Sequence, residues 1–327
     1  MKNKVGIPRG LMYYYYFPSW KIFLKEMGLK VIVSPPTNKK ILDNGVKIAV
    51  DDICLPFKVY YGHVLELLDK VDYLFVPRFI SLGKNNYVCP KFMGLPDMLR
   101  SHINDLPELI EPTIDLRKGI MPVRTIAHKI GKQLNKNYIT TELAYWKAVK
   151  KHKEFKRLQQ QGHTAVESIN LLEKKQLTME KKIHNGRLSI AVLGHCYITN
   201  DKYISMDMIN YLSEQDINIF TVEMFNNCIL EKAATRQSKK LFWIYNREVM
   251  GSAFHMIYDR EQVDGIIQVT AFGCGPDSLV KELVEIKCKH KSISVLNLNL
   301  DEHTGEAGLI TRLEAFIDLL QRKKMMA

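Results

Sequence analysis

The sequence of 327 residues predicts an α/β protein with two parallel-sheet domains, a helical segment between them and a cleft where they meet. Three observations lead to this fold class. Short apolar runs alternate with helical stretches in both halves, long polar helices interrupt the alternation, and parts of the two halves resemble each other. We expect an N-terminal α/β domain at residues 1–125, a helical connector at 126–186 and a C-terminal α/β domain at 187–327.

The alternation begins with the first residues of the chain. Apolar runs rich in Val, Ile, Leu and Phe predict strands at 4–8, 30–35 and 71–77. Helical stretches lie between them, over about 18–27, 39–50 and 57–69. The runs lack a clean period of two, which is typical of strands buried on both faces of a parallel sheet.

The pattern changes after about residue 125. The segments 140–161 and 165–184 are long and polar, and Gly162 separates them. In the second segment Val166, Ile169, Leu172 and Leu177 form one apolar stripe. We interpret this region as a helical connector that ends at Asn185-Gly186.

The alternation resumes after the connector. We expect strands at 188–194, 217–223, 263–270 and 292–300, and helices over about 203–214, 239–254, 276–288 and 308–322. The stretch "QVDGIIQVTAFGCGPD" matches "KVDYLFVPRFIS…VCPKFMGLPD" in layout, with Val-Asp, an apolar strand, a loop, a cysteine, a proline and then a helix. This similarity predicts an internal repeat.

The net charge is +12, from 47 Lys and Arg against 35 Asp and Glu. Residues 147–187 hold eleven of these basic residues and four Glu, so much of the excess belongs to one helical segment. We interpret it as a solvated helix face rather than a nucleic-acid site, because no nucleic-acid-binding motif accompanies it. The sequence has no secretory signal and no apolar run of about 18 residues, so we expect a soluble, cytoplasmic protein that does not contact a membrane.

The carboxyl ends of parallel strands are where ligands bind in open α/β sheets. Several cysteines and histidines follow the predicted strands: Cys89, His195, Cys196, Cys228 and Cys274. Cys54 precedes a helix that leads into a strand, so it belongs near the same edge. Cys288, at a helix end, is expected to be structural or exposed.

Three of these cysteines share a local context, in "ICLPFK", "VCPKF" and "GCGPDS". In each, a proline follows the thiol within two residues and can begin a helix, whose free N–H groups favour a thiolate. Thiolates bind metals, so Cys54, Cys89 and Cys274 are candidate ligands. The alternatives are cysteines buried as small apolar residues, or a nucleophilic Cys274 with His195, His63 or His303 as its base.

Other polar and aromatic residues near the strand ends have two interpretations. Asp301, Glu302, His303 and Glu306 in "DEHTGEAG" either cap a helix or form a polar wall of the site that can move a proton. His63 is interpreted mainly as a packed histidine. The "YYYY" run at 13–16 is expected in the core rather than stacked on a ligand.

The chain resembles the relatives of 2-hydroxyacyl-CoA dehydratase and benzoyl-CoA reductase, and most closely the branch of acyl-CoA dehydratase activase-related proteins, or CoA protein activases. The resemblance spans nearly the full chain and rests on a set of segments: "GIPRGLMYYYYFPSW", "SPPTNKKILDNGV", "DDICLPFKVYYGHV", "VPRFISL", "CPKFMGLPD", "FGCGPDSLV" and "DEHTGEAGLITRLEAF". Cys196 departs from the pattern, which favours proline at that point.

The resemblance implies paired flavodoxin-like (Rossmann-like) domains that hold a [4Fe–4S] cluster in the cleft, with Cys54, Cys89 and Cys274 as ligands. It also implies that a separate ATP-hydrolysing activase delivers low-potential electrons, because this sequence shows no Gly-rich phosphate loop. The electrons would pass to an acyl-CoA or another small acceptor, with Glu302, His303 and His195 as candidate catalytic residues. The chain would act as a homodimer or a heterodimer. The alternative is a non-catalytic ligand-binding or adaptor subunit without a redox metal.

Overall fold

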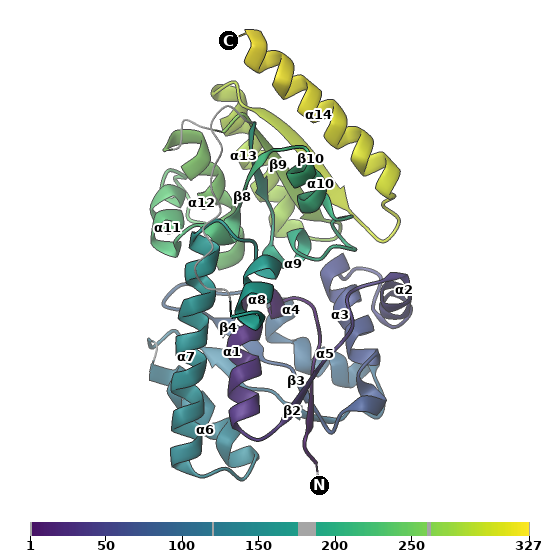
Figure 1. The fold of residues 1–327 in the computed structure, drawn as a ribbon, viewed down its shortest axis with the longest axis vertical. Helices are drawn as coiled ribbons and strands as arrows, with labels where there is room; N and C mark the ends of the chain where they lie inside the picture. Colours follow the sequence, from purple (N-terminus) through teal and green to yellow (C-terminus); the bar gives the residue numbers. More distant parts are fainter. Residues whose placement is uncertain (1, 120, 176–187, 260–262, 327) are drawn as a thin grey trace.

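The computed structural model describes residues 2–119, 121–175, 188–259 and 263–326 and has two parallel four-stranded sheets. In the view of Figure 1, one sheet lies in the lower half of the molecule and the other in the upper half. The N-terminal sheet has the order β2-β1-β3-β5 and consists of β1 (Lys4–Ile7), β2 (Lys30–Val33), β3 (Tyr73–Phe75) and β5 (Glu108–Ile110). The C-terminal sheet has the order β10-β9-β7-β8 and consists of β7 (Ser189–Leu193), β8 (Asn218–Thr221), β9 (Gly265–Ala271) and β10 (Ser294–Leu300).

The two sheets have the same topology. In each, the first strand lies between the second and the third, and the fourth lies beyond the third. All strand pairs in both sheets are parallel. The α/β class and the paired flavodoxin-like arrangement are therefore confirmed, and the common strand order agrees with the repeat seen in the sequence.

One small sheet was not predicted. Strands β4 (Arg78–Ser81) and β6 (Thr113–Asp115) pair in parallel, with an irregularity between Phe79 and Ser81. We expected a loop after the strand at 71–77. The short β4 lies within that expected loop, separated by two residues from the end of β3, and pairs with a strand more than 30 residues away in the chain, which no local pattern indicates.

The helices of the N-terminal half are α1 (Tyr13–Glu26), α2 (Lys39–Ile48), α3 (Leu55–Leu65), α4 (Pro90–Met93) and α5 (Leu95–His102), with a 3₁₀ turn at Leu68–Lys70. Helix α1 begins five residues before the expected start at 18, although Pro18 lies inside it. Its first turn is buried, with Tyr13 and Tyr14 at 4% and 3% exposure. Tertiary packing of this turn therefore outweighs the local signal of the proline.

The middle of the chain is helical, with α6 (Met121–Gln133), α7 (Tyr138–Gln160) and α8 (Ala165–Glu173). Helix α7 packs along α1 (Figure 1). A capping box begins α8, in which Thr164 and Glu167 satisfy each other's backbone N–H groups. The end of the expected helix 165–184, with Leu177 of its stripe, lies outside the described residues, and the boundaries of the three segments stay predictions.

The C-terminal sheet is covered by helices on both faces: α9 (Cys196–Thr199), α10 (Met208–Glu214), α11 (Asn227–Ala234), α12 (Ile244–Tyr258), α13 (Gly275–His290) and α14 (Glu306–Met326), with a 3₁₀ turn at Val222–Met224. Side chains of β7 alternate between two cores. Ala191 and Leu193 pack in a core with α11, α12 and α13, whereas Ile190 and Val192 belong to the core that contains α10 and α14. The alternation explains why β7 is apolar at every position.

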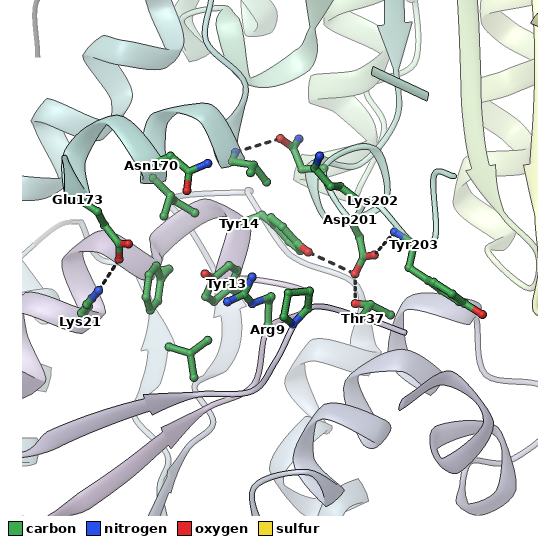
Figure 2. A pocket seen from close by; sticks show the side chains of 16 residues that line it. Arg9, Tyr13, Tyr14, Lys21, Thr37, Asn170, Glu173, Asp201, Lys202 and Tyr203 are labelled. Carbon is green, nitrogen blue, oxygen red and sulfur yellow. Dashed lines mark hydrogen bonds and ion pairs between the residues drawn. The ribbon is translucent and has the colours of Figure 1, made fainter. Parts of the chain in front are cut away.

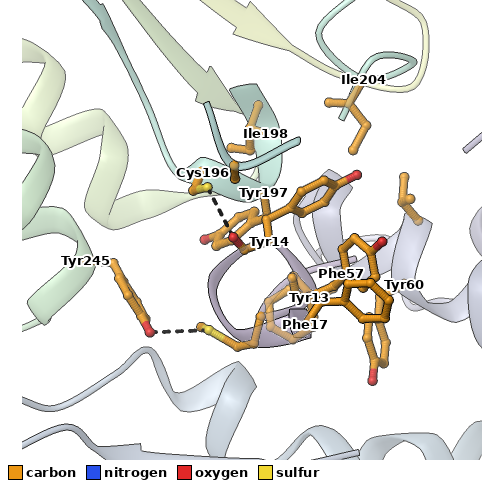
Figure 3. Packing of buried hydrophobic residues seen from close by; sticks show 14 of the residues in the cluster. Tyr13, Tyr14, Phe17, Phe57, Tyr60, Cys196, Tyr197, Ile198, Ile204 and Tyr245 are labelled. Atoms are coloured by element: carbon orange, nitrogen blue, oxygen red, sulfur yellow. Dashed lines mark hydrogen bonds between the residues drawn. The ribbon is translucent and has the colours of Figure 1, made fainter. Parts of the chain in front are cut away.

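The larger core runs through both halves of the molecule. It joins residues of α1 and α3 to residues around α9 and α12 (Figure 3). The ring centroids of Tyr15 and Tyr245 are 4.8 Å apart, and the Tyr245 hydroxyl donates a hydrogen bond to Met12 Sδ at 3.3 Å. The tyrosine run therefore lies in the core, as predicted, and it also forms the contact between the two halves. Among the described helices, none is long and apolar enough to cross a membrane.

Candidate functional site

A cavity of about 190 Å³ lies where the two halves meet, and all three candidate cysteines line it. Cys54 and Cys89 come from the N-terminal half, and Cys274 follows strand β9 of the C-terminal sheet. The remaining wall is formed mainly by aromatic residues, two small residues and a few polar side chains: Phe57, Lys91, Phe92, His195, Tyr197, Trp243, Tyr245, Asn246, Gly273, Gly275 and Pro276. We call this space the thiol cavity.

Each of the three cysteines is the residue that precedes a helix. Cys54 precedes α3, Cys89 precedes α4 and Cys274 precedes α13, and in every case a proline lies in the first turn. This is the arrangement that the Cys-Pro context predicts, because proline fits the start of a helix without losing a backbone hydrogen bond. His195 likewise precedes α9. Four helix starts therefore surround the thiol cavity.

The loop that carries Cys274 depends on glycine. Gly273 has φ +79°, and a Cβ atom built on it would lie 3.3 Å from Cys54 Cα. Glycine therefore allows both the left-handed backbone and the close approach of this loop to Cys54. No atom outside its neighbours lies within 4 Å of a Cβ built on Gly275, so the next residue leaves open space.

Burial raises the pKa of all three thiols. For Cys54 the Lys91 ammonium partly offsets the burial, and for Cys89 a hydrogen bond from the Lys91 backbone N–H does so. For Cys274 burial and the neighbouring Asp277 carboxylate both raise the pKa, to well above its ordinary value. The helix starts therefore do not by themselves produce thiolates, contrary to the simple expectation. A bound cation would have to displace the thiol protons.

A buried histidine–carboxylate pair adjoins Cys274. His195 Nε2 lies 2.9 Å from Asp277 Oδ1, and the same oxygen accepts a hydrogen bond from Asn246 Nδ2 at 2.6 Å. His195 and Asp277 are each 4% exposed, and the His195 ring stacks on Tyr197 with centroids 5.0 Å apart. His195 Nδ1 and Asp277 Oδ2 are buried and have no hydrogen-bond partner among the residues that the structure describes. Such orphaned atoms are expected where a ligand belongs.

This pair and Cys274 form a possible metal site. His195, Cys274 and Asp277 each offer one ligand atom, and these three atoms lie within 4.8 Å of one another. Sulfur, imidazole nitrogen and carboxylate oxygen are all donors that transition metals accept. The arrangement can therefore hold a metal ion or orient an imidazole toward one.

The other three cysteines do not line the thiol cavity. Cys196 is buried, and its Sγ lies 3.8 Å from the Tyr14 carbonyl oxygen (Figure 3). Cys228 is exposed on α11. Cys288 is fully buried in the core of the C-terminal half, so of the two expectations, structural or exposed, the structure agrees with the first.

Two of the candidate catalytic residues also lie away from the thiol cavity. Glu302 Oε1 pairs with Lys58 Nζ at 2.6 Å, an ion pair between the two halves, and His303 is exposed. Asp301 accepts hydrogen bonds from the His303 backbone N–H and the Thr304 hydroxyl. The segment 301–304 is therefore arranged as a turn with an ion pair. Of the three candidates, only His195 lines the thiol cavity.

His63 is packed, as expected. It is fully buried on α3, with Nδ1 2.9 Å from Ser34 Oγ and Nε2 2.9 Å from Thr37 Oγ1. Burial and, to a smaller extent, the Arg9 charge lower its pKa to about 3, so it is neutral at ordinary pH. It does not line the thiol cavity.

Sequence reasoning missed several residues of the site. Asp277 stands three residues after Cys274 in "GCGPD", where an acidic residue in the first turn of a helix is ordinarily a capping feature. Lys91 stands two residues after Cys89, and Asn246 and Trp243 lie in a helical stretch far away in the chain. Only the positions of Asp277 and Lys91 beside a candidate cysteine could have identified them.

Comparison with known protein families gives one match. No curated protein matches this chain. The sequence model of the CoA enzyme activase uncharacterised domain (DUF2229) matches residues 4–225, which is more than half of the chain and includes Cys54, Cys89 and His195. Cys274, the neighbouring Asp277 and the other cavity residues of the C-terminal half from Trp243 onward lie beyond the matched range. On this match, the chain belongs to the CoA enzyme activase family defined by that domain.

Proposed function

We propose that this protein is an iron–sulfur redox component of an acyl-CoA enzyme system, in which Cys54, Cys89 and Cys274 hold a [4Fe–4S] cluster. The observation that carries the proposal is the convergence of three cysteines, each at the start of a helix, on one cavity between the two halves. Three cysteines leave one iron for a ligand other than cysteine or for a substrate. When bound, the cluster would supply a one-electron store.

The residues around the cavity fit such a group. Backbone N–H groups at the helix starts favour negative charge, and the Lys91 ammonium adds a positive charge beside Cys54. Gly273 and Gly275 leave space near Cys274. The aromatic residues restrict water, which is a means by which proteins tune the potential of a cluster.

His195 is the candidate for proton transfer. Asp277 and Tyr197 hold its ring in place, and its Nδ1 has no partner within the described structure. An imidazole fixed in this way can hold a proton for an acceptor bound in the cavity, or it can serve as the fourth ligand. We propose an acyl-CoA or another small molecule as the acceptor, and an ATP-hydrolysing activase as the electron donor.

Anaerobic purification and reconstitution, followed by iron and sulfide analysis and electron paramagnetic resonance, test the proposal. We expect about four irons and four sulfides per chain. Cys54→Ser, Cys89→Ser and Cys274→Ser should each remove most of the iron, whereas the matched Cys288→Ser and Cys228→Ser should not. A reconstituted protein without iron, or equal loss in all five variants, would contradict the proposal.

A second candidate is a site for one divalent cation such as Zn²⁺, favoured by the cluster of His195, Cys274 and Asp277. In that case metal analysis gives one zinc and no sulfide, and Asp277→Asn lowers metal content as strongly as Cys274→Ser. Cys89→Ser then leaves the metal in place. For the [4Fe–4S] proposal the two variants behave the other way round: Cys89→Ser lowers the metal content strongly and Asp277→Asn does not. The reason is that Cys89 is then a ligand and Asp277 is not.

The metal-free alternatives are tested by the same preparations. A ligand-binding or adaptor subunit would be stabilised by an acyl-CoA without any metal. A nucleophilic Cys274 would lose activity on alkylation in metal-free protein. The raised pKa of Cys274 beside the Asp277 carboxylate does not favour this nucleophile.

A further inference from the structure

A second and larger cavity, of about 420 Å³, lies on another side of the contact between the two halves. It is bounded by the loop after β1 with the first turns of α1, by α8, and by residues 200–203 after α9 (Figure 2). We call it the Arg9 cavity. Its volume is in the range of pockets that bind small organic molecules.

Arg9 is a cation without a carboxylate partner in the part of the chain that the structure describes. Its guanidinium lies over the Tyr13 ring, 5.6 Å from the centroid, and its Nε is buried without a hydrogen-bond partner. Figure 2 shows Arg9 beside Tyr13 with no dashed line to a neighbour. An unpartnered, half-buried guanidinium is costly unless an anion joins it.

The other charges of the cavity are already paired. Lys21 forms an ion pair with Glu173, and Lys202 forms one with Asp207 at 3.2 Å. The Asp201 carboxylate accepts hydrogen bonds from Tyr14, from Thr37 and from two backbone N–H groups. Arg9 is thus the one charged side chain of this lining for which no partner is found among the described residues.

The surroundings of Arg9 favour an anion with an apolar part. Helix α1 begins at Tyr13 and its first turn lines the cavity, so the positive end of the helix dipole adds to the guanidinium charge. Phe17 and Ile169 supply buried apolar surface on either side. A guanidinium binds carboxylate and phosphate oxygens through paired N–H donors.

From these observations we propose that the Arg9 cavity binds a small organic oxyanion, a carboxylate or a phosphate ester, whose apolar part lies against Tyr13, Phe17 and Ile169. The site is separate from the thiol cavity and does not depend on the proposed metal. Because the two halves of the chain both line it, the ligand would also hold the halves together.

Isothermal titration calorimetry on the full-length protein tests the proposal, with phenylacetate and phenyl phosphate as oxyanion probes and phenylacetamide as the neutral control. At least one oxyanion should bind ~10-fold or more tightly than the amide, and Arg9→Gln should remove a similar factor. Binding of phenylacetate alone identifies a carboxylate site, and binding of phenyl phosphate alone identifies a phosphate site. Absence of binding by both, or equal binding of the amide, overturns the proposal.

Three further variants show whether a loss of binding in Arg9→Gln comes from the Arg9 charge. Lys21→Gln removes an ion-paired charge from the same lining and should change affinity by less than about threefold. Arg9→Lys should restore part of the binding lost in Arg9→Gln. If Arg9→Gln does not fold, Asn170→Trp at the exposed mouth of the cavity replaces it, because the indole should block entry without altering the charge. Equal losses in Lys21→Gln and Arg9→Gln, or full binding by folded Asn170→Trp, overturn the proposal.

Discussion

The two cavities at the contact between the halves share one segment of the chain but are otherwise built from different elements and carry different chemistry. The segment after β7 contributes to both, with His195 in the thiol cavity and Asp201 in the Arg9 cavity, and α9 lies between these residues. The thiol cavity has three cysteines with raised pKa values, and His195 in its lining and the adjoining Asp277 each have one buried polar atom without a partner among the described residues. The Arg9 cavity has a network of hydrogen bonds and one cation for which the described residues supply no partner. Two sites that share the segment after β7 can thus be suited to different ligands, the thiol cavity to a metal group and the Arg9 cavity to an anion.

The network beside the Arg9 cavity crosses the contact between the halves. Ser34 bonds to His63, His63 to Thr37, Thr37 to Asp201, and the Tyr14 hydroxyl donates to Asp201 at 3.3 Å. All of these partners except Thr37 are buried. The comparison teaches that hydrogen bonds between the two halves shape the Arg9 cavity and leave one cation, Arg9, open to a ligand, whereas the thiol cavity offers thiols and an imidazole nitrogen. The predictions that follow test this difference.

The largest expected effect is a pH dependence of stability that comes from His63. Its pKa is about 3 in the folded protein and near 6.5 when unfolded, so the unfolded chain binds the extra proton between these values. The contribution of this group to the free energy of unfolding is complete above pH 6.5 and is lost as the pH falls toward 3, by about 5 kcal/mol in total. Urea denaturation at several pH values should show a flatter profile for His63→Gln. The exposed His303→Gln should retain the profile of the parent, and an unchanged slope in His63→Gln would contradict the assignment.

The next largest effect on stability is expected when the Asp201 carboxylate is removed as a hydrogen-bond acceptor. Asp201→Ala leaves the buried Tyr14 hydroxyl and two backbone N–H groups without a partner, so we expect a loss of about 3 kcal/mol in the free energy of unfolding. Asp201→Asn keeps an oxygen acceptor and should lose only about 1 kcal/mol. Equilibrium denaturation measures both. Equal losses in the two variants would show that the hydrogen bonds contribute little.

Substitution of Glu302 tests whether this residue has a structural role, through its ion pair, or a catalytic one. Its ion pair with Lys58 is largely shielded, since the side chains are 18% and 8% exposed. Removing the carboxylate in Glu302→Gln should lower stability by about 2 kcal/mol and leave the metal content unchanged. The exposed pair of Lys2 and Glu108 is the control, and Glu108→Gln should cost about 0.5 kcal/mol or less. A Glu302→Gln variant of unchanged stability that no longer transfers electrons would restore Glu302 as a catalytic candidate.

The smallest effect concerns the backbone of the thiol cavity. Gly273→Ala places a Cβ at positive φ and 3.3 Å from Cys54 Cα, so we expect a loss of about 1 kcal/mol and a lower iron content. Gly275→Ala adds a Cβ into open space at the start of α13 and should leave stability unchanged. Thermal denaturation and iron analysis check both variants. Equal behaviour of the two would remove the role assigned to Gly273.

The sequence predicted the larger features because they depend on local patterns. Apolar runs located the eight strands of the two main sheets except β5, and the proline after each of three cysteines located the thiols at helix starts. Strands β5 and β6 have only three residues each, and α4 has four. Elements of this length lack a periodicity that can be recognised. Each of the two strands pairs with a neighbouring strand, and α4 is a single turn.

The sequence by itself determined the α/β class, the similarity between its two halves and the three candidate cysteines, since these follow from short-range patterns and from the conformational preference of proline. Only the tertiary structure decided that His195 and Asp277 pair beside Cys274, that Glu302 pairs with Lys58, and that Arg9 faces a cavity in which no described acidic residue pairs with it. The physical reason is that electrostatic and hydrogen-bond partners depend on distance in space. In the first two cases the partners are 82 and 244 residues apart in the chain, so no local pattern could reveal them.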